Sequence, residues 1–528
     1  MVFSYRRHLP LALLVAGFSL RLFHAIYRFL NADEILHYLL SVQPSLAATY
    51  RASLTSAHPP LLIVFLHYWG AFNHSELWLR LPSLLAGTAF AWIMYRWLKL
   101  VSSEATALIG LVLFLFSPPL VILSSEVRQY SLLLLFCSLS LYLFDCAIQR
   151  DSAVLILLSA ASLYGALLTH YSSLIFALTL GIYAFLRLMS SRSRGAVVSA
   201  WVAGQLGAIA IIGFLFTHHV PLLRARGAPE GIAGTYLRHS VFKPGEDNVI
   251  TFVVRSNIRL FHYLFSQAAV GLVGMLLFVL GIVVLLRGAK QTGNHARTSN
   301  WQLAVLFCCP LIVNCVLALF RVYPYGGTRH NSYLSIVALS GIAVALAQWR
   351  PQYIRQKLFV LGLLLLVCNF FPSPLGEYIG LRNQSRGQMA QAMNSLQAAP
   401  PGAIIFTDHQ GGLQLSYYLC HDKAVQLAQP LSPLLSSRCG RFPLVSVGRW
   451  IFEGDSFAED LRDAQKTDSW RRATRAYFFQ AGWLIEKEPE LREELRRDGC
   501  TTLGNFGRNI FACQLSSESS NSLSSKQN

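Results

Sequence analysis

The chain of 528 residues is 54% hydrophobic and only 13% charged, a composition that excludes an ordinary water-soluble domain and indicates a membrane protein. Its formal net charge of +18 lies largely in short segments between apolar runs. Basic residues in such loops record orientation in a membrane, so the charge does not indicate nucleic acid as a partner.

Apolar runs of about 18 to 24 residues recur from residue 9 to residue 372, and each can cross a hydrocarbon core of about 30 Å as a helix. They predict an all-α polytopic membrane domain over residues 1–374. The first run has no small-residue cleavage site and is typical of a signal anchor. The eleven predicted spans are 9–29, 80–98, 104–123, 130–148, 153–169, 172–188, 197–216, 262–286, 301–320, 331–348 and 357–373.

The run PPLLIVFLHYWGAF at residues 59–72 is short for a crossing and predicts an interfacial or re-entrant helix in the first external loop. A crossing there would make twelve spans. Without it, most basic loops lie on the same side as Arg6 and Arg7, which is the cytoplasm by the positive-inside rule. The loop 217–261 carries six basic residues on the other side and opposes this assignment without overturning it.

Under this topology the extracytoplasmic face collects a set of polar residues that random placement would scatter over both faces. Ionisable groups at membrane depth are costly and are therefore candidates for function. The set comprises Asp33, Glu34, His58, Glu126, Arg128, His170, Tyr171, Arg329 and His330.

The stretch NADEILHYLL at residues 31–40 places two acids side by side. Asp33 and Glu34 follow Asn31, so they can simply cap a helix. Alternatively, one carboxylate acts as a general base or holds a cation while its neighbour is structural. Adjacent residues on a helix point about 100° apart, so a shared-proton dyad is not expected, and Asp33 is predicted to face the site.

The other candidates also have ordinary structural alternatives. His58 in HPPL can begin a helix or anchor it at the interface. The segment EVRQY at 126–130 can be a self-paired ion couple, and Tyr171 in THYSSL fits an aromatic belt. Arg329 in YPYGGTRHNSY can bind lipid headgroups nonspecifically or serve as a phosphate ligand, which its planar fork of donors suits.

Beyond about residue 375 long apolar runs stop and charges become dense, which predicts a smaller C-terminal α/β domain over residues 375–514 and a disordered Ser-rich tail at 515–528. Residues 402–420 predict a strand, a Gly-containing turn and a helix, as in half of a doubly wound unit. No Gly-x-Gly-x-x-Gly turn is present. The domain is therefore predicted to be an extracytoplasmic accessory domain with no nucleotide site.

Four of the ten cysteines lie in this domain, at positions 420, 439, 500 and 513. An even number in an oxidising compartment allows two disulfides in three possible connectivities. We predict the pairs Cys420–Cys439 and Cys500–Cys513. No His or Cys cluster has metal-ligand spacing, although carboxylates can hold a divalent cation beside phosphate.

The order of the motifs ADEILHY, HPPLLIVFLHYWGAFNHSELWLRLPSLLAG, SSEVRQYSLLLLF, THYSSL and GGTRHNSYLSI resembles the GT-C superfamily of membrane glycosyltransferases. The likeness is to bacterial relatives of the protein O-mannosyltransferases and of the aminoarabinose transferase that modifies lipid A. It covers residues 10–345 and is most specific in its first half. The extra domain here is C-terminal, unlike in the protein mannosyltransferases, which leaves the acceptor open.

The resemblance implies an inverting enzyme of a bacterial cell membrane that moves a sugar from a polyprenyl-phosphate donor to a lipid, glycan or protein acceptor. The essential acid of the first external loop matches Asp33, with Glu34 beside it. We expect Arg128, Arg329 and His58 to bind the donor phosphate. Glu126, His170, Tyr171 and His330 are expected to bind sugar or acceptor.

This mechanism requires no cofactor. The alternative with a divalent cation stays open, and Asp33 is the residue expected to hold the cation. Two rival interpretations use the same features. A flippase for lipid-linked sugars also has many spans, but it should show paired halves with interrupted helices, which the sequence lacks. A polysaccharide polymerase or ligase shares substrate and side but uses a different fold, with its arginines in a large external loop such as 217–261.

Overall fold

A computed structural model gives the arrangement of the chain. It describes residues 2–191, 195–224, 237, 239–288, 298–348, 351–371, 385–420, 434–452, 454–482, 489–497, 499–507 and 509–515. Two compact units are present: a helical unit of residues 1–24, 56–62 and 80–379, and an α/β unit of residues 25–55, 63–79 and 380–528. The predicted tail at 515–528 begins one residue too early, because Leu515 is the last residue of a β-strand; residues 516–528 and the predicted domain boundary at 374 lie outside the described residues.

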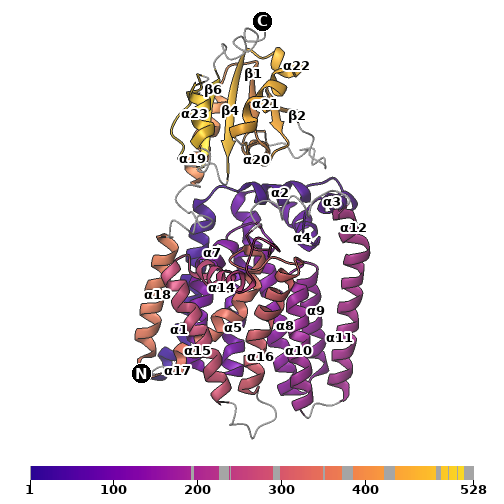
Figure 1. Ribbon diagram of the computed structural model, residues 1–528, viewed down its shortest axis with the longest axis vertical. Coiled ribbons are helices and arrows are strands. Elements are labelled where there is room, and N and C mark those ends of the chain that lie inside the picture. Colours follow the sequence, from indigo (N-terminus) through magenta and orange to yellow (C-terminus); the bar gives the residue numbers. More distant parts are fainter. Residues whose placement is uncertain are drawn as a thin grey trace. The chain divides into compact units, whose positions relative to one another are not determined.

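Consecutive helices of the helical unit, such as α8, α9 and α10, lie side by side (Figure 1). Its elements are α1 (Val2–Tyr27), α5 (Glu76–Val101), α6 (Glu104–Phe116), α7 (Pro118–Leu123), α8 (Tyr130–Arg150), α9 (Ala153–Leu167), α10 (Ser173–Ser190), α11 (Gly195–Phe214), η1 (Leu215–His219), α12 (Val220–Arg224), α14 (Val249–Phe265), α15 (Ala268–Arg287), α16 (Asn300–Leu319), η3 (Arg329–Leu334), α17 (Ser335–Gln348), η4 (Pro351–Tyr353) and α18 (Ile354–Phe370). The last turn of α1 and the first of α5 belong to the other unit.

Eight helices among the described residues are long and apolar enough to cross a membrane, and they correspond to eight of the eleven predicted spans. The predicted spans 153–169 and 357–373 correspond to shorter helices, α9 and α18. The count of eleven thus stays a prediction. The all-α multi-pass membrane domain itself is confirmed.

The single helix predicted over 104–123 is wrong, because α6 ends at Phe116 and α7 starts at Pro118. Two consecutive prolines lack the N–H groups that would continue α6. The open carbonyls at the end of α6 are satisfied by the buried guanidinium of Arg21, which donates to Leu115 O at 2.6 Å and to Phe114 O at 3.0 Å.

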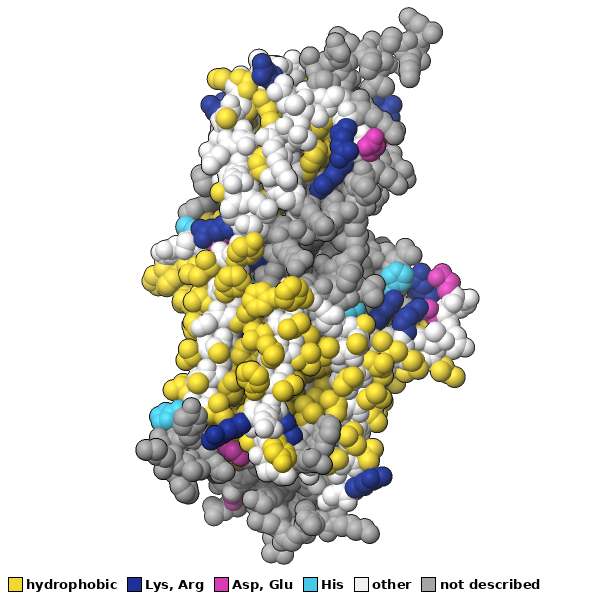
Figure 2. All heavy atoms as spheres, turned by 90° about the vertical axis from the view of Figure 1, so that its left-hand side faces the viewer, with side chains coloured by type: hydrophobic (Ala, Val, Ile, Leu, Met, Phe, Trp, Pro, Cys, Tyr) yellow, Lys and Arg dark blue, Asp and Glu magenta, His cyan; other side chains and the backbone are white. Residues whose placement is uncertain are grey.

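The outer surface of the helical unit is apolar, as a protein in contact with lipid requires. Figure 2 shows hydrophobic side chains covering one face of these helices, with Lys and Arg gathered toward the ends. On α18, Phe359 is 72% exposed and Val360 63%, a degree of exposure that a protein surrounded by water rarely gives to a whole helix face. The chain is therefore an integral multi-pass membrane protein.

A buried ion pair ties three helices together inside this unit. The carboxylate of Asp145 on α8 pairs with Arg187 Nε of α10 at 3.3 Å and accepts from Trp97 Nε1 of α5 at 2.9 Å. Tyr183 Oη also donates to it at 2.9 Å. All of these side chains are fully buried, so the charges are tolerated only because each is paired and hydrogen-bonded.

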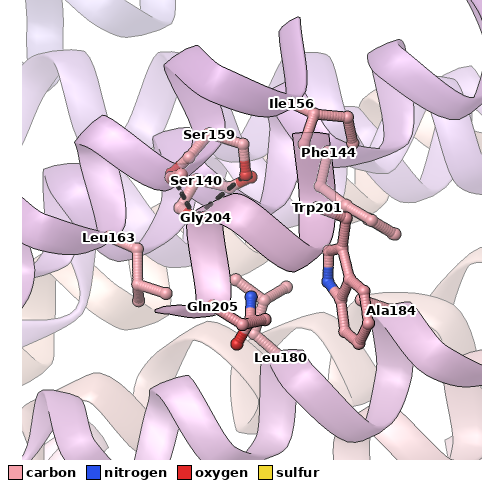
Figure 3. A pocket seen from close by; sticks show the side chains of 11 residues that line it. Ser140, Phe144, Ile156, Ser159, Leu163, Leu180, Ala184, Trp201, Gly204 and Gln205 are labelled. Atoms are coloured by element: carbon pink, nitrogen blue, oxygen red, sulfur yellow. Dashed lines mark hydrogen bonds between the residues drawn. The ribbon is translucent and has the colours of Figure 1, made fainter. Parts of the chain in front are cut away.

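Helices α8, α9, α10 and α11 surround a small cavity of about 20 Å³ (Figure 3). Ser140 and Ser159 close one side, each hydroxyl donating to the other residue's carbonyl at 2.8 and 2.7 Å. Trp201 and Gln205 line another side. Such a volume accommodates about one water molecule, so this cavity is too small for a sugar or a lipid chain.

The α/β unit contains a six-stranded mixed sheet in the order β2-β3-β1-β4-β6-β5, with β1 parallel to β3 and β4 and the other pairs antiparallel. Its elements are α2 (Ala32–Ser41), α3 (Leu46–Ser53), α4 (Leu61–Gly70), α19 (Arg386–Gln397), β1 (Ala403–Thr407), α20 (His409–Tyr418), β2 (Leu434–Cys439), β3 (Phe442–Val447), α21 (Gly454–Gln465), α22 (Asp468–Arg471), β4 (Arg475–Ala481), α23 (Pro489–Arg497), β5 (Thr501–Thr502) and β6 (Ile510–Leu515). The predicted strand–turn–helix over 402–420 is confirmed by β1 and α20.

The sheet is covered on both faces (Figure 1). Ile405 packs with Met393 of α19 and Leu415 of α20 on one face, whereas its neighbours in β1 point to the other. There Phe406 packs with Phe457 of α21 and Leu495 of α23. This alternation gives three layers, because successive residues of a strand face opposite sides.

Both predicted disulfides are confirmed. Cys420, just after α20, is bonded to Cys439 at the end of β2, and Cys500 is bonded to Cys513 in β6. The six cysteines of the apolar helices are not in disulfides. Each bond closes a short loop within the α/β unit and so limits the freedom of its unfolded chain.

We expect the stability of the α/β unit to decrease as pH rises from about 4 to about 7. Asp408 caps α20, and its burial raises the pKa of its carboxyl from 3.8 to about 7. In this pH window the folded chain binds one proton more than the unfolded chain, so unfolding becomes easier as pH rises, by up to about 4 kcal/mol. Thermal unfolding of the detergent-purified chain between pH 4.5 and 7.5 measures this slope.

Asp408→Asn keeps a capping side chain and removes the titration, so the slope should flatten in this variant. Asp463→Asn removes an exposed carboxylate from α21 and is the matched control. An unchanged slope in Asp408→Asn would show that another group is responsible.

Candidate functional site

Three histidines from distant parts of the sequence meet in the helical unit. His58, before α4, stacks on His170, between α9 and α10, with ring centroids 5.1 Å apart. His330 of η3 lies 5.7 Å from His170 and 6.2 Å from His58. Tyr130, the first residue of α8, is fully buried and contacts all three rings, at 5.3 Å from His170. We call these four residues the histidine cluster.

Local sequence explains how two of these segments are held together. Pro59 and Pro60 have no N–H group to donate, so Leu61 supplies the first backbone donor after His58. Its N–H donates to Leu168 O at 3.0 Å, which joins the HPPL segment directly to the turn that carries His170.

The third segment is shaped by glycine and asparagine. Gly326 has φ of +130°, a conformation that other residues rarely adopt. Asn331 Nδ2 donates to Gly326 O at 3.1 Å, while its Oδ1 accepts from Asn314 Nδ2 of α16 at 2.7 Å. These contacts fix the start of η3, where Arg329 and His330 lie.

His170 presents a hydrogen-bond donor to the cluster. Ser172 N–H donates to its Nδ1 at 3.1 Å, and the Ser172 hydroxyl lies 2.8 Å from the same atom. Because Nδ1 is an acceptor, the proton of the neutral ring is on Nε2. Among the described residues, this Nε2 is buried with no hydrogen-bond partner.

The surroundings of His170 are positively charged. Burial, together with the charges of Arg128 and Arg329, lowers the pKa of His170 to about 3. Arg128 also lies over the ring of Tyr130, its guanidinium carbon 5.5 Å from the centroid. The site thus combines neutral imidazoles with two arginines, which is suited to an anion.

The segment of Arg128 is buried and irregular. Arg128 N–H donates to Glu126 O at 2.8 Å, and Arg128 O accepts from Ser83 Oγ of α5 at 3.3 Å. Glu126 is 5% exposed and Arg128 3% exposed. The predicted pair is therefore inside the helical unit, next to the histidine cluster, and not on its surface.

Unlike the adjacent His170, Tyr171 has its side chain bonded outside the histidine cluster. Its hydroxyl is 2.6 Å from Nδ1 of His219, the last residue of η1. Tyr171 therefore connects α10 to the end of the long α11–η1 helix. Its predicted contact with sugar or acceptor stays a prediction.

Sequence reasoning missed two aromatic residues of this region. Tyr130 lies within the EVRQY segment. Its position directly after a polar turn could have indicated that it belongs to the site. Tyr263 of α14 lies near enough to Tyr130, Glu126 and Arg329 to feel their charges. No sequence motif marked Tyr263.

Asp33 and Glu34 belong to the α/β unit, at the start of α2. Glu34 is in a capping box: its N–H donates to Asn31 Oδ1 at 3.0 Å, and its Oε2 accepts from Asn31 N–H at 2.9 Å. The capping alternative thus accounts for Glu34. The Asp33 carboxylate is outside this box and 9% exposed, and Asp33 O lies 2.6 Å from His37 Nδ1.

No group of three or more His, Cys, Asp or Glu side chains in the part of the chain that the structure describes is arranged to hold a metal ion. Asp33 as a cation ligand, and a divalent cation in general, therefore stay predictions. The histidine cluster is suited to hydrogen bonding and not to tetrahedral metal coordination.

We expect His170→Gln to retain more activity than His170→Ala. A glutamine amide can place a donor near the position of Nε2, whereas alanine leaves the pocket without one. The loss should be within about 5-fold for glutamine and about 10- to 100-fold for alanine. Because His170 is already neutral above pH 4, neither variant should change the shape of the pH–rate profile between pH 5.5 and 8.

Steady-state rates at several pH values test this. A profile whose midpoint near pH 6.5 disappears in His170→Gln would contradict the neutral assignment. His218→Gln, an exposed histidine at the end of η1, is the matched control.

The sequence profile of the dolichyl-phosphate-mannose-protein mannosyltransferase family matches residues 57–217. This segment contains His58, Glu126, Arg128, His170 and Tyr171. A search of curated proteins found no match.

The fold is similar to that of ArnT from Cupriavidus metallidurans in the apo state, with a TM-score of 0.53 and 13% identity over 96% of this chain and 98% of that chain. It is also similar to ArnT bound to undecaprenyl phosphate, with a TM-score of 0.51 and 12% identity over the same shares of both chains. The predicted resemblance is confirmed: the fold is similar to that of ArnT, and residues 57–217 match the mannosyltransferase profile.

Proposed function

We propose that this protein is an inverting glycosyltransferase that moves a sugar from a polyprenyl-phosphate donor to a lipid, glycan or protein acceptor at the extracytoplasmic face of a bacterial cell membrane. The observation that carries the proposal is the histidine cluster with Arg128 and Arg329. It joins hydrogen-bond donors and fixed positive charge in a buried setting.

The charge of this site suits the leaving group. When the bond from the sugar C1 to the phosphate oxygen breaks, the polyprenyl phosphate gains a second negative charge. Cations placed at the phosphate therefore stabilise the transition state more than the ground state. Neutral His170 adds a hydrogen bond without needing to be protonated, and His58 lies beside it as a second proposed ligand.

The comparisons support a polyprenyl-phosphate donor. The matching family takes its name from dolichyl-phosphate-mannose, and one ArnT structure holds undecaprenyl phosphate. Both molecules are phosphates of long isoprenoid chains. The matched segment 57–217 contains five of the proposed phosphate, sugar and acceptor ligands: His58, Glu126, Arg128, His170 and Tyr171.

We propose that Asp33 takes the proton from the acceptor hydroxyl. The new bond joins the acceptor oxygen to the sugar C1 on the face opposite the phosphate, which inverts the configuration. Glu126, Tyr171 and His330 bind sugar or acceptor, and Glu34 contributes by capping the helix that carries Asp33. The reaction as written needs no metal.

The test is transfer of radiolabelled sugar in proteoliposomes, with undecaprenyl-phosphate donors carrying mannose, glucose or aminoarabinose, and extracted envelope lipids, glycans and proteins as acceptors. Labelled acceptor with the anomeric configuration opposite to that of the donor is the expected product. Movement of donor across the bilayer without transfer would indicate a flippase and overturn the proposal.

A further inference from the structure

The segment directly before the Asp33 helix is built into the C-terminal domain. Arg28 pairs with Ser385 in an isolated β-bridge. Phe29 is fully buried in the same hydrophobic cluster as Met389 of α19 and Phe479 of β4. The chain leading into α2 is thus anchored in a core formed more than 350 residues later in the sequence.

The next residue, Leu30, is held by the hydroxyl of Tyr418, the last residue of α20. Leu30 N–H donates to Tyr418 Oη at 2.7 Å, and Tyr418 Oη donates to Glu76 Oε1 at 2.7 Å. Glu76 Oε2 pairs with Arg386 Nε of α19 at 3.3 Å. The Glu76 side chain is only 5% exposed, so its charge depends on these partners.

The middle of α2 is held by the neighbouring tyrosine. The ring of Tyr38 packs against Tyr417 at 5.5 Å and against His74 at 5.6 Å. Tyr417 Oη donates to His74 O at 2.8 Å. The two consecutive tyrosines at the end of α20 therefore contact α2 at its start and along its length.

These contacts reach Asp33 through a short and rigid connection. Asn31 follows Leu30 directly and is locked to Glu34 by the two hydrogen bonds of the capping box. Asp33 lies between Asn31 and Glu34, as the second residue of α2. A change in the direction of the backbone at Leu30 must therefore move the Asp33 carboxylate.

We propose that Tyr418 and Glu76 are positioning residues that set the orientation of the Asp33 carboxylate, so that the C-terminal domain takes part in catalysis. This inference rests on the proposed role of Asp33 as the base. A displacement of about 1 Å in a catalytic group can cost on the order of 100-fold in rate. Positioning by Tyr418 should thus affect the rate of transfer and leave donor affinity unchanged.

The experiment compares the native protein with Tyr418→Phe, Asp33→Asn and the double variant, all as full chains in proteoliposomes. Tyr418→Phe removes one oxygen and keeps the ring, and we expect kcat to fall at least 10-fold with the Kd for undecaprenyl phosphate unchanged. In the Asp33→Asn background the same change should cause no further loss, because no carboxylate remains to be oriented. Ser416→Ala removes a hydroxyl that is bonded within α20 and is the matched control.

The outcomes separate this inference from the proposed function. If Asp33→Asn loses transfer while Tyr418→Phe keeps the native kcat, the positioning role is wrong and the function stands. Losses that add in the double variant would show a merely structural role and also overturn the inference. Full activity in Asp33→Asn would remove the proposed base itself.

If Tyr418→Phe unfolds in detergent, Glu76→Gln takes its place, since glutamine retains an acceptor for Tyr418 and loses the ion pair with Arg386. The same comparison of kcat, Kd and non-additivity with Asp33→Asn then tests the positioning role.

Discussion

Asp33→Asn is expected to lower the rate of sugar transfer about 10²- to 10⁴-fold while leaving polyprenyl-phosphate binding within about 2-fold, because it removes a general base and keeps the shape of the side chain. The proposed ligands of the phosphate lie in the helical unit, on other segments of the chain. The capping box of α2 uses Asn31 and Glu34, so the helix should persist in the variant. Single-turnover transfer with bound donor measures the chemical step directly.

Asp463→Asn, which removes an exposed carboxylate from α21, controls for loss of one negative charge. Glu34→Gln provides a second comparison, since it weakens the cap without touching the Asp33 carboxylate and should cost much less than Asp33→Asn. Equal activity of Asp33→Asn and the native protein would reject Asp33 as the base. Loss of donor binding together with activity would place Asp33 in the donor site instead.

Arg128→Gln is expected to lower kcat on the order of 10²- to 10³-fold, comparable to the loss of one preorganised electrostatic partner in other enzymes. The guanidinium is buried beside Tyr130 and acts on His170, so its charge is only weakly screened by water. The variant should also bind undecaprenyl phosphate more weakly than the native protein. Arg128→Lys should restore only part of the rate, because lysine lacks the planar fork of donors.

Arg150→Gln removes an arginine from the other end of α8 and is the matched control. Transfer kinetics and titration of undecaprenyl phosphate on the same preparations give kcat and Kd together. Native kcat in Arg128→Gln, with the protein folded, would exclude Arg128 as a phosphate ligand. Arg329 would then be the remaining candidate.

Much of the fold could be predicted because its signals are local. The length of an apolar run decides whether a helix can cross a bilayer. Glycine permits and proline restricts particular local backbone conformations, as Gly326 shows in its turn and the prolines at 118 and 119 show at the start of α7. The prolines still broke the predicted 104–123 helix, because the apolar run continues through them. The hydropathy of a segment indicates that it is buried, but it does not indicate where a helix within that segment ends.

The candidate site could be predicted only as a set of residues on one face. The sequence placed His58, Arg128, His170 and Arg329 among its candidates, but it assigned them from motifs whose mutual distances it does not contain. The contacts among His58, His170 and His330 depend on how the segment 58–61, α9, α10 and η3 pack within the helical unit. That packing also buries Tyr130, which was not among the candidates predicted from the sequence.

The sequence by itself determined the membrane class and the α/β character of the C-terminal domain, because run length and strand–helix pattern act within short segments. The four cysteines of that domain allowed two disulfides in three pairings, and the structure showed which pairing is present. Only the tertiary structure decided the tautomer of His170, the separate roles of Asp33 and Glu34, and the joining of residues 28–30 to α20. These depend on hydrogen bonds between residues that are far apart in the chain. Their geometry is fixed by the packing of complete helices and a sheet, a property of the whole fold that no single segment carries.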